Sequence, residues 1–109
     1  MYISMNISTS CVNSAADILG SKWTAQILRE FSNGSQRFCE LERAIPEINP
    51  RTLTKRLDEL QERAIITPID GAGYNGYELT QKGHDLIPIL QKMADWGAKY
   101  PRDPSWNVA

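Results

Sequence analysis

The sequence predicts a mainly α-helical domain with one small β-hairpin. Apolar residues recur three or four positions apart in five segments, which is the spacing of one helix face. Two short runs of strand-forming residues flank a glycine-rich turn, "GAGYNG", which indicates a hairpin. The chain has 109 residues, which is enough for one domain with a hydrophobic core.

The first part of the chain is expected to form two helices and a brief strand. Residues 12–19 place apolar side chains on one face, and Gly20 fits the end of that helix. Ser21 is a suitable N-cap for a second helix, which should end at Asn33–Gly34. Residues 35–37 fit a short strand.

Two further helices, joined by a short turn, should follow. The first covers residues 38–44 or 45 and ends before Pro46. Asn49 is a good N-cap for the next helix, and Pro50 suits its first position because an N–H there has no helical partner. The inward stripe of this fourth helix should comprise Leu53, Leu57, Leu60 and Ala64.

The rest of the domain should be the hairpin and a final helix. Residues 65–70 and 77–79 are the expected strands, and Thr80 is the expected N-cap of the last helix. The order helix, helix, short strand, helix, helix, strand, strand, helix is that of a winged helix-turn-helix domain. The predicted fold class is therefore mainly α with a small β-hairpin, winged helix-turn-helix.

The fourth helix has cations at its start and carboxylates at its end, although the net charge of the chain is only −1. Residues 49–56 hold three cations and no carboxylate, whereas residues 58–62 hold three carboxylates and no cation. A helix that enters the major groove of DNA by its N-terminus needs this order, because its first turns meet bases and phosphates. The carboxylates should limit how deeply it enters. A solvated amphipathic helix with charges arranged by chance is the alternative.

Six residues at the start of this helix are expected to contact DNA. With the leucines facing the core, Arg51 points outward, where its guanidinium can form two bonds to guanine. Lys55, one turn later, suits phosphate and base equally. Arg56 should turn back toward the third helix and reach only the phosphate backbone or Glu40 and Glu42. The six residues are Asn49, Arg51, Thr52, Thr54, Lys55 and Arg56.

Three segments match one known pattern: "CVNSAADILGSKWTAQILREF", "RFCELERAIPEINPRTLTKRLDEL" and "YELTQKGHDLIPILQKMADWG". The matched positions are Cys11, Gly20, Lys22, Trp23, Arg37, Phe38, Glu40, Leu41, Ile48, Pro50, Leu53, Thr54, Arg56, Leu57, Glu78, Leu79, Thr80, Gly83, Asp95, Trp96 and Gly97. Together they resemble the HxlR family of bacterial transcriptional regulators. The resemblance implies a winged-helix homodimer that binds a two-fold operator near promoters, with dimer contacts from the first and last helices.

The chain departs from this family pattern in the wing and after the fourth helix. Many members have Arg or Lys in a longer wing, whereas the turn here has no cation, so Tyr74 and Asn75 are the expected, weaker backbone contacts. Ala64 stands where the family often has Gly. A left-handed residue there would strain Ala, so the helix is expected to end differently. Lys22 and Arg37, each at the start of an element, are further candidates for phosphate contact, with an exposed surface cation as the alternative.

The two cysteines, Cys11 and Cys39, lack the spacing of a metal site. Cys11 is expected just before the first helix, where N–H groups favour the reactive thiolate. Several family members use a cysteine at this position to sense quinones, aldehydes or oxidants. The alternative is a small residue packed at the dimer interface. Cys39 is the weaker candidate, and it stands where the family usually has Ser.

The apolar stripe of the last helix is expected to pair with a second copy of the chain. One domain of this size cannot bury that stripe and also cover its first helix. The expected interface residues are Leu86, Leu90, Met93, Trp96 and Trp106. The domain layout is a flexible N-terminal arm (1–10), the winged helix-turn-helix domain with its dimerisation helices (11–97) and a C-terminal tail (98–109).

Other function classes are disfavoured. No apolar run approaches the ~20 residues that span a bilayer, and the N-terminus does not resemble a signal peptide, so a cytoplasmic protein without a membrane partner is expected. No carboxylate pair, nucleophile–base set or phosphate loop indicates an enzyme, and the single histidine, His84, should be a surface residue. No cofactor is expected.

The predicted function is a sequence-specific DNA-binding transcriptional regulator, with double-stranded DNA and a second copy as partners and an unknown effector. The alternative is a winged-helix protein-interaction module that has lost DNA binding. The near-neutral charge and the cation-free wing favour that alternative.

Overall fold

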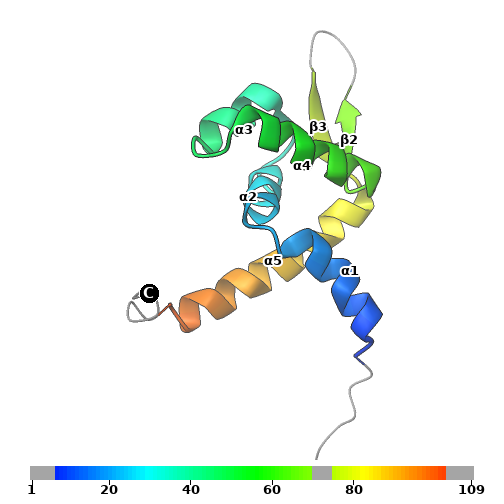
Figure 1. Cartoon of the computed structure of the whole chain (residues 1–109), viewed down its shortest axis with the longest axis vertical. Helices are drawn as coiled ribbons and strands as arrows, with labels where there is room; N and C mark the ends of the chain where they lie inside the picture. Colours follow the sequence, from blue (N-terminus) through cyan, green and yellow to red (C-terminus); the bar gives the residue numbers. More distant parts are fainter. Residues whose placement is uncertain (1–6, 70–74, 103–109) are drawn as a thin grey trace, which may run out of the picture.

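The order of helices and strands in the computed structural model is the order predicted from the sequence (Figure 1). The structure describes residues 7–69 and 75–102. The elements within these ranges are α1 (Thr9–Leu19), α2 (Lys22–Phe31), β1 (Gln36–Arg37), α3 (Phe38–Ala44), α4 (Pro50–Glu62), β2 (Ile66–Ile69), β3 (Gly76–Leu79) and α5 (Gln81–Lys99). The fold is therefore a winged helix-turn-helix with a helix added at each end.

Three of the helices begin at the N-caps that the sequence predicted. The side chain of Ser21 accepts a hydrogen bond from the backbone N–H of Thr24 at the start of α2. Asn49 Oδ1 accepts one from the N–H of Thr52 at 3.0 Å, and Pro50 follows as the first residue of α4. Thr80 Oγ1 accepts one from the N–H of Gly83 at 3.1 Å. These bonds satisfy N–H groups that have no partner inside the helix.

The first helix begins three residues earlier than predicted. Ser8 is its N-cap, and α1 runs from Thr9. Thr9 and Ser10 are polar, so apolar spacing gave no signal for this turn. Cys11 therefore lies in the first turn of the helix and not just before it. The expected arm, residues 1–10, overlaps the start of α1.

The hairpin strands belong to a three-stranded antiparallel sheet in the order β1-β3-β2. In the hairpin, Ile66 pairs with Leu79 and Pro68 pairs with Tyr77. Because β2 lies at an edge of the sheet, Pro68 can be accommodated there despite its missing N–H. On the other side of β3, Gln36 of β1 also pairs with Tyr77, which ties the start of α3 to the hairpin. The turn at 70–74, with the predicted contact Tyr74, lies outside the described residues.

One hydrophobic core joins the helices to the sheet. Three of the four residues predicted for the inward stripe of α4 are buried in it, since Leu53, Leu57 and Leu60 are 0%, 1% and 2% exposed. Trp23 is half-buried and packs against this core. The buried apolar residues are Ile18, Leu19, Ile27, Leu28, Phe31, Leu41, Ile45, Ile48, Leu53, Leu57, Leu60, Ile65, Ile66, Leu79 and Leu86.

Ala64 does not belong to the inward stripe, and both predictions about it are wrong. It is exposed and has a left-handed backbone, with φ of 60°. The chain leaves α4 through this residue, and the next one, Ile65, enters the core. The need to place Ile65 in the core outweighs the strain of a left-handed alanine.

The end of α4 is fastened to the start of α5, and we call this arrangement the α4–α5 clasp (Thr80, Lys82 and Gly83 against residues 63–65). The hydroxyl of Thr80 shares its one proton between the carbonyl oxygens of Ala64 and Ile65, which lie 2.5 and 3.2 Å from Oγ1. Lys82 Nζ donates to the carbonyl of Arg63 at 2.6 Å. Gly83 packs so closely on the Ile65 carbonyl that a Cβ at this position would overlap the oxygen.

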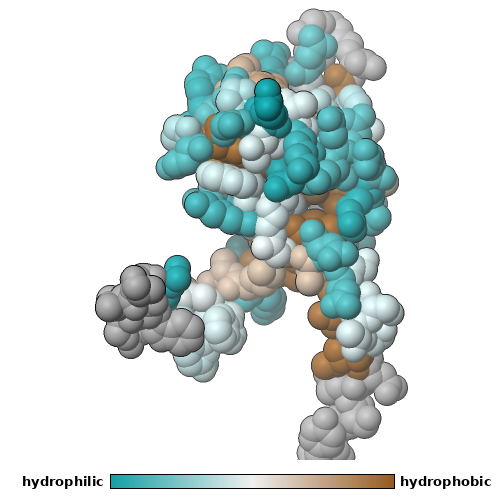
Figure 2. Space-filling model, in the orientation of Figure 1, coloured by the Kyte–Doolittle hydropathy of each residue, from teal (hydrophilic) through white to brown (hydrophobic). Residues whose placement is uncertain are grey.

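Two helices project from the body that α2, α3, α4 and the hairpin form (Figure 1). In Figure 2, apolar surface appears on the projecting N-terminal part of α1 and along α5, whereas the surface over α4 is mostly hydrophilic. The large exposed apolar residues are Ile7, Val12, Ile89, Met93, Trp96 and Tyr100. Within the described ranges, no helix combines the length and apolar character needed to cross a membrane.

Candidate nucleic-acid interface

The side of α4 opposite its buried leucines is exposed and charged. Arg51 and Lys55 lie on this outward face, as the helical spacing predicted. They contribute to a shallow hollow lined by Arg51, Thr54, Lys55, Asp58, Glu59 and Glu62. The cations lie near the start of the helix and the carboxylates toward its end, so the predicted gradient of charge is present on one continuous surface.

Three charged residues of this face, from its front to its middle, are not paired with one another. In the part of the chain that the structure describes, Arg51, Lys55 and Asp58 have no ion pair and no side-chain hydrogen bond. The ion pair on α4 is instead the one between Arg56 and Glu59. The outward groups are therefore available to a ligand without breaking an internal contact.

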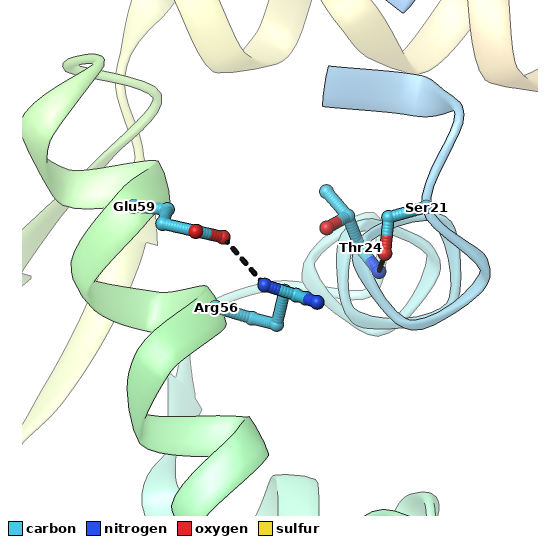
Figure 3. A network of polar contacts seen from close by, with 4 residues as sticks. All are labelled: Ser21, Thr24, Arg56 and Glu59. Carbon is cyan, nitrogen blue, oxygen red and sulfur yellow. Dashed lines mark hydrogen bonds and ion pairs between the residues drawn. The ribbon is translucent and has the colours of Figure 1, made fainter. Parts of the chain in front are cut away.

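Arg56 lies on a different side of α4 from the one predicted. Its NH1 is 2.9 Å from Glu59 Oε1, and the pair lies beside the N-terminus of α2, near Ser21 and Thr24 (Figure 3). The expected contacts with Glu40 or Glu42 of α3 are not formed. At about 100° per residue, Arg56 lies beside the leucine stripe on the flank that faces α2. Its side chain is 24% exposed, and its Nε is buried and has no hydrogen-bond partner among the described residues.

The other candidates on α4 divide into capping and outward residues. Asn49 uses its carbonyl oxygen to cap the helix, which leaves its NH₂ group as the donor for a phosphate. Thr52 is half-buried on the flank of the helix. Thr54 is exposed and lines the hollow beside Lys55. Asn49 and Thr54 therefore border the cationic end of the outward face.

The remaining predicted DNA contacts that the structure describes are exposed but lie on other elements. Lys22 is the first residue of α2, and its Nζ lies 4.6 Å from the centroid of the Trp23 ring. Arg37 is the N-cap of α3, and its backbone N–H donates to Glu40 Oε1 at 2.7 Å. Asn75 is exposed directly before β3.

Both cysteines are exposed thiols. Cys11 borders a groove between α1 and α5, which also includes Ser14, Ala15, Ile18, Lys82, Asp85, Leu86 and Ile89. Lys82 thus lines the groove beside Cys11 and also donates to the end of α4. No pattern in the sequence indicates this link, because residues 11, 63 and 82 are distant along the chain.

The predicted interface residues of α5 differ in their exposure. Leu86 is only 9% exposed and faces the core of its own chain, so it leaves little surface for a partner. Leu90 is half-buried, whereas Met93 and Trp96 are 47% and 66% exposed. Trp106 lies outside the described residues. Ile89, which the prediction did not include, follows Leu86 by three residues and is 47% exposed.

A second groove extends the exposed apolar surface of α5 toward α2. It has a volume of about 600 Å³ and is lined by Ala25, Gln26, Arg29, Ser32, Ile87, Leu90, Gln91, Met93 and Ala94. Single-sequence periodicity could not place this groove, since it depends on how α2 and α5 cross.

Comparison with known proteins points to one family. The model of the HxlR-like helix-turn-helix family matches residues 18–104. The chain is 38% identical to the uncharacterized HTH-type transcriptional regulator YvaP of Bacillus subtilis, over 94% of this chain and 98% of that protein. It is 31% identical to the HTH-type transcriptional regulator YodB of the same organism, over 85% of this chain and 88% of that protein.

Solved structures of similar proteins share the fold over most of their length. Quinone-bound YodB from B. subtilis superposes with a TM-score of 0.75 at 30% identity, covering 86% of this chain and all (100%) of that one. The redox regulator HypR in its reduced form superposes with a TM-score of 0.74 at 32% identity, covering 82% of this chain and 91% of that one.

Proposed function

The chain belongs to the HxlR-like helix-turn-helix family of transcriptional regulators, and from this premise we propose that it acts as a homodimer that reads a two-fold DNA site through α4. The observation that carries the proposal is the outward face of α4. Its front presents Arg51 and Lys55, which have no ion pair or side-chain hydrogen bond with the described residues, while its leucine side is held in the core. A major groove ~12 Å wide admits such a helix.

The proposal assigns roles by position on the domain. Arg51, at the front, makes the base contact, and Lys55 meets base or phosphate. Asn49, Thr52 and Thr54 border this surface as phosphate contacts. A regulator of this kind works on the chromosome, so the proposal also places the protein in the cytoplasm and gives it no catalytic role.

Arg56 has a smaller role in this proposal than the sequence suggested. Its guanidinium must leave Glu59 before it can hold a phosphate, so a contact with DNA replaces the existing ion pair and does not add to it. A partly exposed ion pair contributes only ~0–1 kcal/mol, so replacing one such pair by another adds little to the free energy of DNA binding. Lys22, Arg37 and Asn75 are proposed as supporting contacts to the DNA backbone.

The proposal is tested by gel shift with promoter DNA at rising salt. Arg51→Ala should cost about 1–3 kcal/mol of binding free energy and relax the preference at one base pair per half-site. Arg56→Ala should weaken binding to all sequences alike, and by less. Lys92→Ala, an exposed cation on α5, is the matched control and should leave the shift unchanged. If Arg56→Ala alters the preferred base and Arg51→Ala does not, the assigned face of α4 is wrong.

We also propose that Cys11 makes DNA binding responsive to oxidants or electrophiles. The support is its exposure in the first turn of α1, beside a groove that reaches the α4–α5 clasp through Lys82. The similar structures include a quinone-bound and a diamide-treated YodB and the reduced and oxidised forms of HypR. Cys39, exposed in the first turn of α3, is the internal comparison.

A further inference from the structure

Asp58 lies in the middle of the outward face of α4, behind the cations of the first turns. It is exposed and lines the same hollow as Arg51 and Lys55. Arg51 and Asp58 are seven residues apart, which places them within about 20° of each other around the helix and about 10 Å apart along its axis. Asp58 therefore faces whatever Arg51 faces.

Among the described residues, Asp58 differs from the neighbouring carboxylate Glu59 in having no partner. Glu59 is held by Arg56 at 2.9 Å. Asp58 makes no ion pair or side-chain hydrogen bond within the residues described, although Lys55 precedes it by three positions. A carboxylate that enters a groove of DNA loses water and needs a new hydrogen-bond donor, because otherwise its desolvation is uncompensated.

We infer that Asp58 is a specificity-determining residue that accepts a hydrogen bond from the exocyclic amino group of cytosine in the major groove. The inference rests on the proposed binding of DNA through α4. An ionised carboxylate has only acceptors. Cytosine presents a single N4 donor in that groove, adenine pairs its N6 donor with an N7 acceptor, and guanine and thymine present acceptor oxygens. Asp58 therefore favours cytosine and opposes the other three bases.

The geometry of α4 also limits where this preference falls. Successive base pairs rise by about 3.4 Å, so an axial separation of about 10 Å corresponds to at most about three base pairs, the value for a helix parallel to the DNA axis. The cytosine read by Asp58 should lie one to about three base pairs from the position read by Arg51. This role differs from a general limit on the depth of insertion, because it acts at one base pair and not on all sequences.

The experiment is selection from randomised duplex DNA with the full-length protein, followed by affinity measurements on single-base variants of the selected site. The wild type should prefer cytosine by about five- to tenfold at one position of each half-site. Asp58→Ala should lose that preference and keep the others, which also reports that the variant is folded. Asp58→Asn should move the preference to adenine, because an amide pairs with N6 and N7.

The matched control is Glu62→Gln, which removes another exposed carboxylate at the last residue of α4 and should leave the selected pattern unchanged. Arg51→Ala identifies the base pair that Arg51 reads, from which the position of the cytosine is counted. A selected site that Asp58→Ala leaves unchanged overturns the role of Asp58 alone. An equal gain in affinity for every sequence overturns it too, since the carboxylate then acts only by repulsion. Failure of the wild type to select any site overturns the proposed function itself.

Discussion

Ala64 is the residue at which the sequence and the backbone disagree most. It adopts φ of 60°, a conformation that costs an L-residue roughly 1–2 kcal/mol and that glycine adopts freely. The surrounding contacts hold it there, since the carbonyl of Ala64 accepts from Thr80 and Ile65 is buried. The strain is local and should be removable by one substitution.

Ala64→Gly should therefore raise the free energy of unfolding by about 0.5–1 kcal/mol, the relief of strain less the added entropy of an unfolded glycine. Urea denaturation at equilibrium measures it. Ala98→Gly, in the last turns of α5, is the control, and it should lower stability or leave it unchanged. Equal destabilisation by both variants would show that Ala64 is not strained.

Single residues were predictable where one local rule decided the outcome. The caps Ser21, Asn49 and Thr80 follow from hydrogen-bonding chemistry within three residues. The backbone conformation of Ala64 was not predictable, because it depends on the burial of the next residue, Ile65. The partner of Arg56 could have been found, since Glu59 follows it by three residues on the same helix.

At the scale of elements, the α4–α5 clasp joins the end of α4 to the start of α5. The hydroxyl of Thr80 makes two kinds of hydrogen bond there. It accepts from the N–H of Gly83, which caps α5, and it donates to the carbonyl of Ala64 just after α4. By comparison, Ser8 caps the exposed start of α1 and has no contact of this second kind among the hydrogen bonds of the described residues.

Thr80→Ala should lower the free energy of unfolding by about 1–2 kcal/mol, because it removes a cap and leaves carbonyl groups of the clasp without that donor. Ser8→Ala should cost about 0.5 kcal/mol or less at a fraying helix end. Chemical denaturation of both variants gives the comparison. Equal losses would mean that the contacts of Thr80 with α4 add nothing to stability.

Most elements could be predicted from the spacing of their apolar residues, but their mutual contacts could not. The leucines of α4 and the strands of the hairpin follow periods that the sequence displays. A strand of two residues has no period, so the pairing of β1 with β3 was not predictable. The first turn of α1 lacked apolar residues and was missed for the same reason.

At the scale of the whole molecule, α1 and α5 leave apolar surface uncovered. The side chains of Met93 and Trp96 are 47% and 66% exposed, and a groove runs from α5 to α2. Contiguous apolar surface of this kind marks an interaction site in a folded protein. The sequence predicted this surface from the stripe of α5, while the groove required the crossing of two helices.

Trp96→Glu should convert the protein from dimer to monomer at micromolar concentration, because a charge would enter the apolar contact between copies. Sedimentation velocity measures the change. His84→Glu, an exposed site at the other end of α5, is the control and should remain dimeric. A wild-type monomer at that concentration would contradict the proposed assembly.

The proposed thiol response also belongs to the whole molecule, since Cys11 and the outward face of α4 lie on different elements. Cys11→Ser should keep DNA binding but lose its release by quinone or diamide, because the hydroxyl is not a comparable nucleophile. Gel shift with and without oxidant provides the measurement. The Cys39→Ser variant should still release DNA when it is treated with quinone or diamide. Release that survives in Cys11→Ser would transfer the role to Cys39 or remove it.

The buried leucines and the clasp together make α4 a rigid part of its domain. Leu53, close to Arg51, and Leu60, close to the clasp, are 0% and 2% exposed, so the helix is held at both ends. Arg51 lies about 20 Å from residues 63–65 at 1.5 Å per residue. A rotation of the whole domain by about 10° about the clasp would therefore move Arg51 by about 3.5 Å, close to the rise of one base pair, with no change of packing inside the core.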